Sequence, residues 1–189
     1  MKKTLLLLLA IFALAACQPQ PRRQGNKNAA QDSTDSPLQH PQGGGKGVAD
    51  EGQPAPEFTL PGPDGIPVSL NELRGQYVVL DFWGTWCKWC IKGIPDMKHY
   101  YEKYQGKFEI LSIDVGDDEE SWRQAIESYD MEWLHVITDE ESAQLLQGLY
   151  KIEGYPTKIV VDPEGRIIKI VVGEDPAFYE FLDELFGGK

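Results

Sequence analysis

The chain has 189 residues, 41% of them hydrophobic, which is enough for one folded domain with a core and additional sequence. Its formal net charge of −12 disfavours a nucleic-acid partner, because phosphate binding requires clustered lysine and arginine side chains. The three cysteines are too few for a scaffold held together by several disulfides.

The N-terminus is predicted to be a targeting sequence. A basic start precedes a short apolar segment that ends in Ala15, Ala16 and Cys17. This pattern resembles the bacterial lipoprotein signal, in which cleavage before the cysteine leaves that cysteine as the lipidated N-terminus; an ordinary signal peptide cut nearby is the alternative. We therefore expect residues 1–16 to be a signal peptide and the acyl chains on Cys17 to hold the protein at a membrane.

Residues 17–52 are predicted to be a lipidated flexible linker, because they are rich in Gln, Pro, Gly, Asn and Ser and have almost no large apolar side chains. The expected location is the bacterial cell envelope, on the periplasmic side. Gln18 stands where an aspartate would suggest inner-membrane retention, so the outer membrane is slightly favoured. The folded domain is expected to span residues 53–189.

Hydrophobic patterns within this domain predict strands that alternate with helices. The expected strands are 54–60, 66–68, 77–82, 108–114, 133–137, 158–161 and 167–172. The expected helices are a single turn at 70–73, one that follows the cysteines to about residue 104, and then 121–129, 140–150 and 176–186. This order, with an inserted helix–strand–helix segment, predicts an α/β fold with a central mixed sheet, helices on both faces and an N-terminal β-hairpin.

An acidic run and a set of leucines predict details of two helices. The acidic run at 116–120 is interpreted as a loop and the first turn of the next helix, where carboxylates suit the helix dipole. The helix at 140–150 is expected to bury Leu145, Leu146 and Leu149.

The strongest chemical signal is the pair Cys87 and Cys90. An apolar, β-branched strand leads into the pair, and a helix follows it. Cys87 should lie at the helix N-terminus, where unpaired backbone N–H groups and the helix dipole favour a thiolate. Cys90, one turn further along, is expected to be more buried and to act second. A Cys-x-x-Cys at a strand-to-helix junction is typical of a redox-active dithiol.

These residues resemble the thioredoxin superfamily. The resemblance rests on the stretch from Asp81 to Cys90, on Pro95 in the following helix, and on Tyr155-Pro156-Thr157 before a hairpin. It covers residues 53–189, and the inserted segment is similar to that of the membrane-tethered TlpA/ResA branch. The resemblance implies a thioredoxin-like fold and a thiol-disulfide oxidoreductase that needs neither a metal nor another cofactor.

The resemblance also implies roles for individual residues. Cys87 would be the attacking thiol and Cys90 the resolving thiol, and Pro156 matches the family's cis-proline beside the dithiol. A cis bond there would leave the backbone of Tyr155 free to pair with an extended substrate segment. The residues expected to contact substrate are Trp86, Trp89, Tyr155 and Thr157.

The departures from the family pattern concern carboxylates. Many relatives have asparagine where this chain has Asp81, and glutamate where this chain has Gly93. We expect Asp81, buried beneath the dithiol, to take the proton of Cys90; a hydrogen-bonded strand aspartate without a catalytic role is the alternative. Thioredoxin's lysine partner for this acid would fall at Ile110, so Asp81 is expected to lack a nearby cation.

Lys88 lies between the cysteines and is expected to tune the redox couple. Its charge beside Cys87 should favour the thiolate, and a more stable thiolate makes the couple more oxidising.

The expected function is reduction of disulfides outside the cytoplasm. The predicted partners are exported proteins with disulfides, apocytochrome c among them, and a membrane-embedded electron donor; a monomer is the default. A disulfide oxidase or isomerase is the alternative on the same scaffold. A peroxidase is less favoured because Thr85 lies two residues before Cys87 rather than three, and a metal-binding module lacks the expected cysteine spacing.

Overall fold

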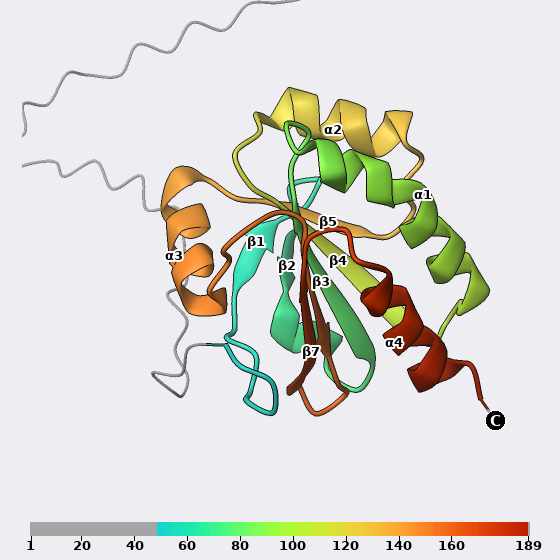
Figure 1. The fold of residues 1–189 in the computed structure, drawn as a ribbon. Helices are drawn as coiled ribbons and strands as arrows, with labels where there is room; N and C mark the ends of the chain where they lie inside the picture. Colours follow the sequence, from blue (N-terminus) through green and yellow to red (C-terminus); the bar gives the residue numbers. More distant parts are fainter. Residues whose placement is uncertain (1–48, 189) are drawn as a thin grey trace, which may run out of the picture. The chain divides into compact units, whose positions relative to one another are not determined.

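The computed structural model of the protein describes residues 49–188 (Figure 1). The strands are β1 Thr59–Pro61, β2 Pro67–Ser69, β3 Tyr77–Trp83, β4 Phe108–Asp114, β5 Leu134–Ile137, β6 Thr157–Val161 and β7 Ile167–Val172. The helices are the 3-10 helix η1 Leu70–Leu73 and the α-helices α1 Lys88–Lys103, α2 Glu119–Ser128, α3 Glu140–Tyr150 and α4 Pro176–Phe186.

Strands β3 to β7 form one five-stranded mixed sheet in the order β5-β4-β3-β6-β7. Strands β3, β4 and β5 are parallel, whereas β6 and β7 pair antiparallel beside them. Strands β1 and β2 form a separate antiparallel hairpin. The predicted α/β thioredoxin-like fold, with a mixed sheet and an N-terminal hairpin, is therefore confirmed.

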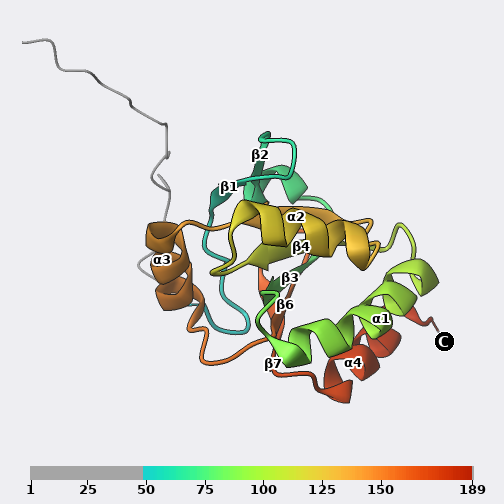
Figure 2. The same cartoon turned by 90° about the horizontal axis from the view of Figure 1, so that it is seen from above.

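Helices cover both faces of the sheet, because the central strand β3 is apolar on both. Val79 and Trp83 share one hydrophobic cluster with side chains of α1, α2 and α4. Val78 and Leu80, which alternate with them, belong to a second cluster with α3, η1 and the hairpin. Figures 1 and 2 show α1 and α4 side by side and α3 on the other side of the sheet.

Each α-helix begins at a residue whose side chain accepts a hydrogen bond from a first-turn amide. The capping residues are Cys87, Asp118, Asp139 and Asp175. Asp118 belongs to the acidic run, and the two glutamates after it lie in the first turn of α2. The interpretation of that run as a helix start is confirmed.

The contacts of the domain already begin at Ala49, which corrects the predicted start at residue 53. Ala49 is buried, and its amide donates to the carbonyl of Leu149. The amide of Gly52 likewise donates to the carbonyl of Ile167. Residues 49–52 therefore pack against the fold, although their polar composition predicts a linker. The predicted signal peptide, the lipidated Cys17 and the rest of the linker lie outside the described residues.

Within residues 49–188, no helix combines the length and the apolar character that crossing a bilayer requires.

Helix α3 buries one fewer leucine than predicted. Leu146 is 2% exposed, whereas Leu145 beside it is 49% exposed. Leu149 packs at the edge of the cluster. The helix lies on the hairpin side of the sheet at the rim of the core, so only a narrow stripe of it faces inward.

These neighbouring leucines give a matched test of the packing. We expect Leu146→Ala to lower the free energy of unfolding by about 2–5 kcal/mol, since it removes a fully buried side chain. Leu145→Ala should change it by less than about 0.5 kcal/mol. Urea denaturation of the two variants measures both values, and equal losses would contradict this packing of α3.

Candidate active site

The dithiol lies where β3 passes into α1. Cys87 is the N-cap of α1, and its sulfur forms a disulfide with Cys90 with a Cα–Cα distance of 5.2 Å. The backbone amide of Cys90 donates to Cys87 Sγ at 3.1 Å. The first-turn amides and the positive end of the helix dipole therefore favour negative charge on the Cys87 sulfur once the disulfide is opened.

The two cysteines are equally buried, which corrects the expectation that Cys90 is the more buried. Each residue is 6% exposed, and both belong to the cluster beneath α1. The disulfide closes the first turn of the helix over this cluster.

Exposed aromatic side chains flank the disulfide. The indole of Trp86 donates from Nε1 to the carbonyl of Val115 at 2.8 Å, and its ring meets the ring of Tyr155 edge-on with centroids 5.1 Å apart. Trp86 and Trp89 are both 55% exposed. Lys88, between the cysteines, is also exposed. Trp86 is therefore fixed in place while much of its surface remains available for contact.

The Tyr155–Pro156 peptide bond is cis, as the resemblance implies. Within residues 49–188, no hydrogen bond engages the backbone N–H or C=O of Tyr155, whereas its hydroxyl accepts a hydrogen bond from Gln147. Thr157 lies apart from the exposed rim, because it is 1% exposed and its hydroxyl donates to the carbonyl of Gly154 at 2.7 Å.

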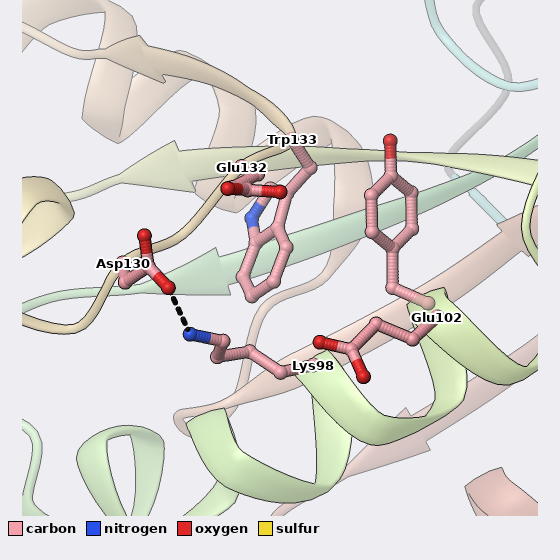
Figure 3. A pocket seen from close by; sticks show the side chains of 6 residues that line it. Lys98, Glu102, Asp130, Glu132 and Trp133 are labelled. Atoms are coloured by element: carbon pink, nitrogen blue, oxygen red, sulfur yellow. Dashed lines mark hydrogen bonds and ion pairs between the residues drawn. The ribbon is translucent and has the colours of Figure 1, made fainter.

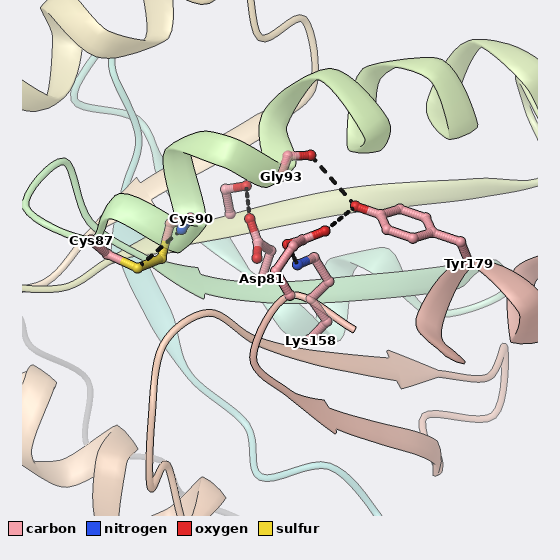
Figure 4. Close-up of polar contacts among 8 residues, drawn as sticks. Asp81, Cys87, Cys90, Gly93, Lys158 and Tyr179 are labelled. Carbon is pink, nitrogen blue, oxygen red and sulfur yellow. Dashed lines mark hydrogen bonds and ion pairs between the residues drawn. A yellow bond between two sulfur atoms is a disulfide. The ribbon is translucent and has the colours of Figure 1, made fainter. Parts of the chain in front are cut away.

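Asp81 lies in β3 on the face that α1 covers. Ser112 Oγ donates to Asp81 Oδ2 at 3.2 Å, and Trp133 Nε1 donates to the same Ser112 oxygen at 2.9 Å. Burial raises the pKa of the Asp81 carboxyl above its ordinary value, and the Ser112 hydrogen bond opposes that rise. Figure 4 shows the carboxylate on the inner side of the helix that carries Cys90.

A cation does lie near Asp81, contrary to the expectation from Ile110. Lys158 is the register partner of Asp81 across β3 and β6, and its charge opposes the rise in the pKa of Asp81. The ammonium group of Lys158 forms an ion pair with Glu174 at 2.7 Å. The sequence holds one signal for this buried ion pair: Lys158 is the single lysine in an otherwise apolar strand, and a buried lysine needs a counter-charge.

A surface pocket along α1 is separate from this site. It is lined by Lys98, Tyr101, Glu102, Asp130, Glu132 and Trp133 (Figure 3). None of these residues belongs to the dithiol or the cis-proline segment, and only Trp133 among them also takes part in the hydrogen bonds around Asp81.

The chain is similar to proteins of known family. A family model described as AhpC/TSA family matches residues 51–170. The chain belongs to this family.

Two similar proteins with curated names are both named as thiol-disulfide oxidoreductases. This member of the AhpC/TSA family is 33% identical over 130 residues to the thiol-disulfide oxidoreductase ResA of Bacillus subtilis, a match that covers 68% of this chain and 71% of that protein. It is 32% identical over 124 residues to the ResA protein of Bacillus cereus, covering 65% and 70%.

A solved structure agrees. The thioredoxin domain of a thiol-disulfide oxidoreductase from Bacteroides vulgatus is 31% identical, with a TM-score of 0.68, and the match covers 74% of this chain and 99% of that one. The resemblance to the ResA branch is confirmed, and the protein is a thiol-disulfide oxidoreductase.

A second buried carboxyl group, which the sequence did not single out, supports the loop before Cys87. Asp114 ends β4 and is fully buried, and its Oδ1 accepts a hydrogen bond from the amide of Asp117 at 3.2 Å. The carboxylate of Asp117 accepts hydrogen bonds from the amide and the hydroxyl of Thr85, both at 2.6 Å. Burial, and then the neighbouring Asp117, raise the pKa of Asp114 to about 8.

Asp114 should therefore make stability depend on pH. Its ordinary pKa is 3.8, so between pH 3.8 and about 8 the folded state holds a proton that the unfolded state releases. The stabilisation is complete below pH 3.8 and is lost as the pH rises to about 8. We expect the free energy of unfolding of the native protein to fall relative to Asp114→Asn by up to about 1.4 kcal/mol per pH unit between pH 5 and 8.

Chemical denaturation of both proteins at several pH values measures this difference. Because the asparagine side chain of the variant does not titrate, subtraction removes the contribution of every other group. Parallel curves across the range would show that Asp114 is ionised in the folded protein.

Proposed function

We propose that this thiol-disulfide oxidoreductase reduces disulfides in exported proteins at the bacterial cell envelope. The observation that carries the proposal is the Cys87–Cys90 pair at the N-terminus of α1, flanked by exposed tryptophans and by a free backbone segment at Tyr155. The lipoprotein-like signal that ends at Cys17 supports the location, and a lipid anchor there would hold the domain on the periplasmic side, with the outer membrane slightly favoured.

The reaction proceeds in two exchanges. The Cys87 thiolate attacks one sulfur of the substrate disulfide, forms a mixed disulfide and releases one substrate thiolate. Cys90 then gives its proton to Asp81 and attacks Cys87 Sγ, which closes the Cys87–Cys90 disulfide and releases the second thiolate. The substrate gains two electrons from the dithiol and two protons, one that left Cys90 through Asp81 and one from solvent. A membrane-embedded thiol-disulfide donor would return the dithiol to its reduced state.

Asp81 has the properties that this step requires. It faces the same cluster as Cys90, its pKa is raised by burial, and a single serine hydroxyl solvates it. A base whose proton affinity exceeds that of an ordinary carboxylate accepts a thiol proton more readily.

The rim suits an extended protein segment as substrate. The unpaired N–H and C=O of Tyr155 can add such a segment as a short strand, with Pro156 fixing the direction of the chain. Trp86 and Trp89 would cover the apolar side chains of that segment. Lys88 is exposed, so its contribution to the thiolate would be partly screened by solvent. Apocytochrome c is one candidate substrate.

A disulfide oxidase or isomerase is the alternative direction for the same pair. A peroxidase is less well supported, because the hydroxyl of Thr85 already donates to Asp117 and lies on the residue two before Cys87.

The reduction potential distinguishes these directions. We expect the Cys87–Cys90 couple to have a potential near that of thioredoxin, about −270 mV, because a reductase must hold electrons at low potential. Alkylation and mass spectrometry across defined redox buffers measure it. A value near about −120 mV would contradict the reductase and support a disulfide-introducing enzyme.

The role of Asp81 can be tested separately. Reduced protein mixed with a dithiobis-nitrobenzoate should release one nitrothiobenzoate when Cys87 attacks and a second when Cys90 resolves the mixed disulfide. We expect Asp81→Asn to slow the second release by about 100-fold near pH 7, the typical contribution of a positioned base. Stopped-flow absorbance measures both phases.

Two controls accompany this test. Cys90→Ser should show the first release only, which assigns the second phase. Glu109→Gln makes the same chemical change on the neighbouring strand, where Tyr101 donates to the carboxylate at 3.0 Å, and should leave both phases unchanged. An unaltered second phase in Asp81→Asn would make Asp81 a structural residue.

A further inference from the structure

A buried ion pair lies beneath α1, the helix that carries the dithiol, and it takes no direct part in the two thiol–disulfide exchanges. Lys158 of β6 and Glu174 of the loop before α4 pair at 2.7 Å, and their side chains are only 3% and 11% exposed. The desolvation of two charges usually offsets most of what such a pair contributes to stability. Stability alone therefore does not account for an ion pair buried this deeply.

Glu174 is held in one place by contacts on both of its oxygens. Lys158 Nζ donates to Oε2, and the Tyr179 hydroxyl donates to Oε1 at 2.8 Å. Tyr179 also approaches the carbonyl of Gly93 at 3.4 Å, which ties this arrangement to α1 (Figure 4). The carboxylate is therefore fixed against the helix that carries Cys90.

Gly93 supplies the space that this carboxylate needs. A Cβ atom at Gly93 would lie 2.1 Å from Glu174 Oε2 and 2.5 Å from its carboxyl carbon. Any larger residue at this position would have to displace the Glu174 side chain. Gly93 is one helical turn beyond Cys90, so Glu174 lies close to the resolving cysteine.

The charges of Lys158 and Glu174 lie close enough to Asp81 to influence its pKa. Asp81 and Lys158 are opposite each other across β3 and β6, yet Lys158 forms its ion pair with Glu174 and not with Asp81. The two charges influence Asp81 in opposite directions: Lys158 lowers its pKa and Glu174 raises it. Glu174 thus keeps the lysine engaged and leaves Asp81 without a direct cationic partner.

Other polar and titratable groups also border this cluster. They are Ser112 of β4, Cys90 and the exposed Asp96 of α1, and Tyr179 of α4. Burial raises the pKa of the Tyr179 hydroxyl far above its ordinary value, so this group stays protonated.

We infer that Glu174 and Lys158 are positioning residues that control the transfer of the Cys90 proton to Asp81. The inference rests on the proposed role of Asp81. During resolution the Cys90 S–H proton moves to the Asp81 carboxylate and the Cys90 sulfur bonds to Cys87 Sγ. By holding Lys158, Glu174 keeps Asp81 a base that accepts this proton; without Glu174, Lys158 would pair with Asp81 and weaken that base.

The test is the pH profile of the second nitrothiobenzoate release, measured on the full chain. The acid limb of this profile, the low-pH range over which the rate rises with pH, reports the coupled titration of Asp81 and Cys90. We expect Glu174→Gln to move this limb to lower pH by about one unit, since it removes a negative charge and frees Lys158 to stabilise ionised Asp81. Lys158→Gln should move the limb to higher pH, because it removes the positive charge.

The opposite signs separate this inference from a structural role. Both variants break the same ion pair, so a loss of packing or stability alone would change them in the same direction. Glu174→Asp keeps the charge and should keep the limb near its native position. Gly93→Ala, which displaces Glu174, should shift the limb as Glu174→Gln does.

A matched control uses the exposed pair Lys98–Asp130, 2.9 Å apart, beside the pocket of Figure 3. Lys98→Gln should leave the acid limb in place. An unmoved limb in Glu174→Gln, or shifts of the same sign in Glu174→Gln and Lys158→Gln, would overturn the inference. If Asp81→Asn does not slow the second release, the proposed role of Asp81 fails instead, so the two failures are distinguishable.

Discussion

The hydrogen bond from the Cys90 amide to the Cys87 sulfur is the contact on which this site depends. It makes a cysteine the N-cap of α1, so the amides that every helix leaves unpaired at its start are directed at the reactive sulfur. That arrangement requires the end of β3 to have a fixed position relative to the start of α1. The strand does so because it is buried on both faces and paired on both edges.

The same burial creates the main energetic cost of the site. Beneath α1 the sheet presents Asp81 and Lys158 at adjacent positions, and Glu174 reaches them from the loop before α4. Ionised groups in such a place are stable only when they are paired or hydrogen-bonded. Here one cation is paired with one carboxylate, and the other carboxylate has a single serine donor. Asp81 is therefore buried without a direct cationic partner, and burial raises the pKa of its carboxyl group.

The outer side of the dithiol is built on a different principle. Trp86 is fixed by the carbonyl of Val115 and by the ring of Tyr155, while Asp117 holds the amide and hydroxyl of Thr85. The loop before Cys87 is therefore anchored to the segment that follows β4. This anchored loop, with its exposed indole surface and the unpaired backbone of Tyr155 beside it, is where we propose that a protein segment binds.

The sequence by itself determined the elements and the chemistry. The strand and helix order, the hairpins and the position of Cys87 at a helix start follow from hydrophobic period, turn residues and spacing, all of which act over a few neighbouring residues. The packing of residues 49–52 and the exposure of Leu145 differ from the prediction, because both depend on what lies on the other side of the packing interface. Only the tertiary structure decided the surroundings of Asp81. A lysine in the apolar strand β6 indicates that a buried counter-charge is needed, but it does not say which carboxylates lie beside that lysine. The antiparallel pairing of β6 with β3 and the return of the chain before α4 decide this, and pairing between distant segments has no local pattern in the sequence.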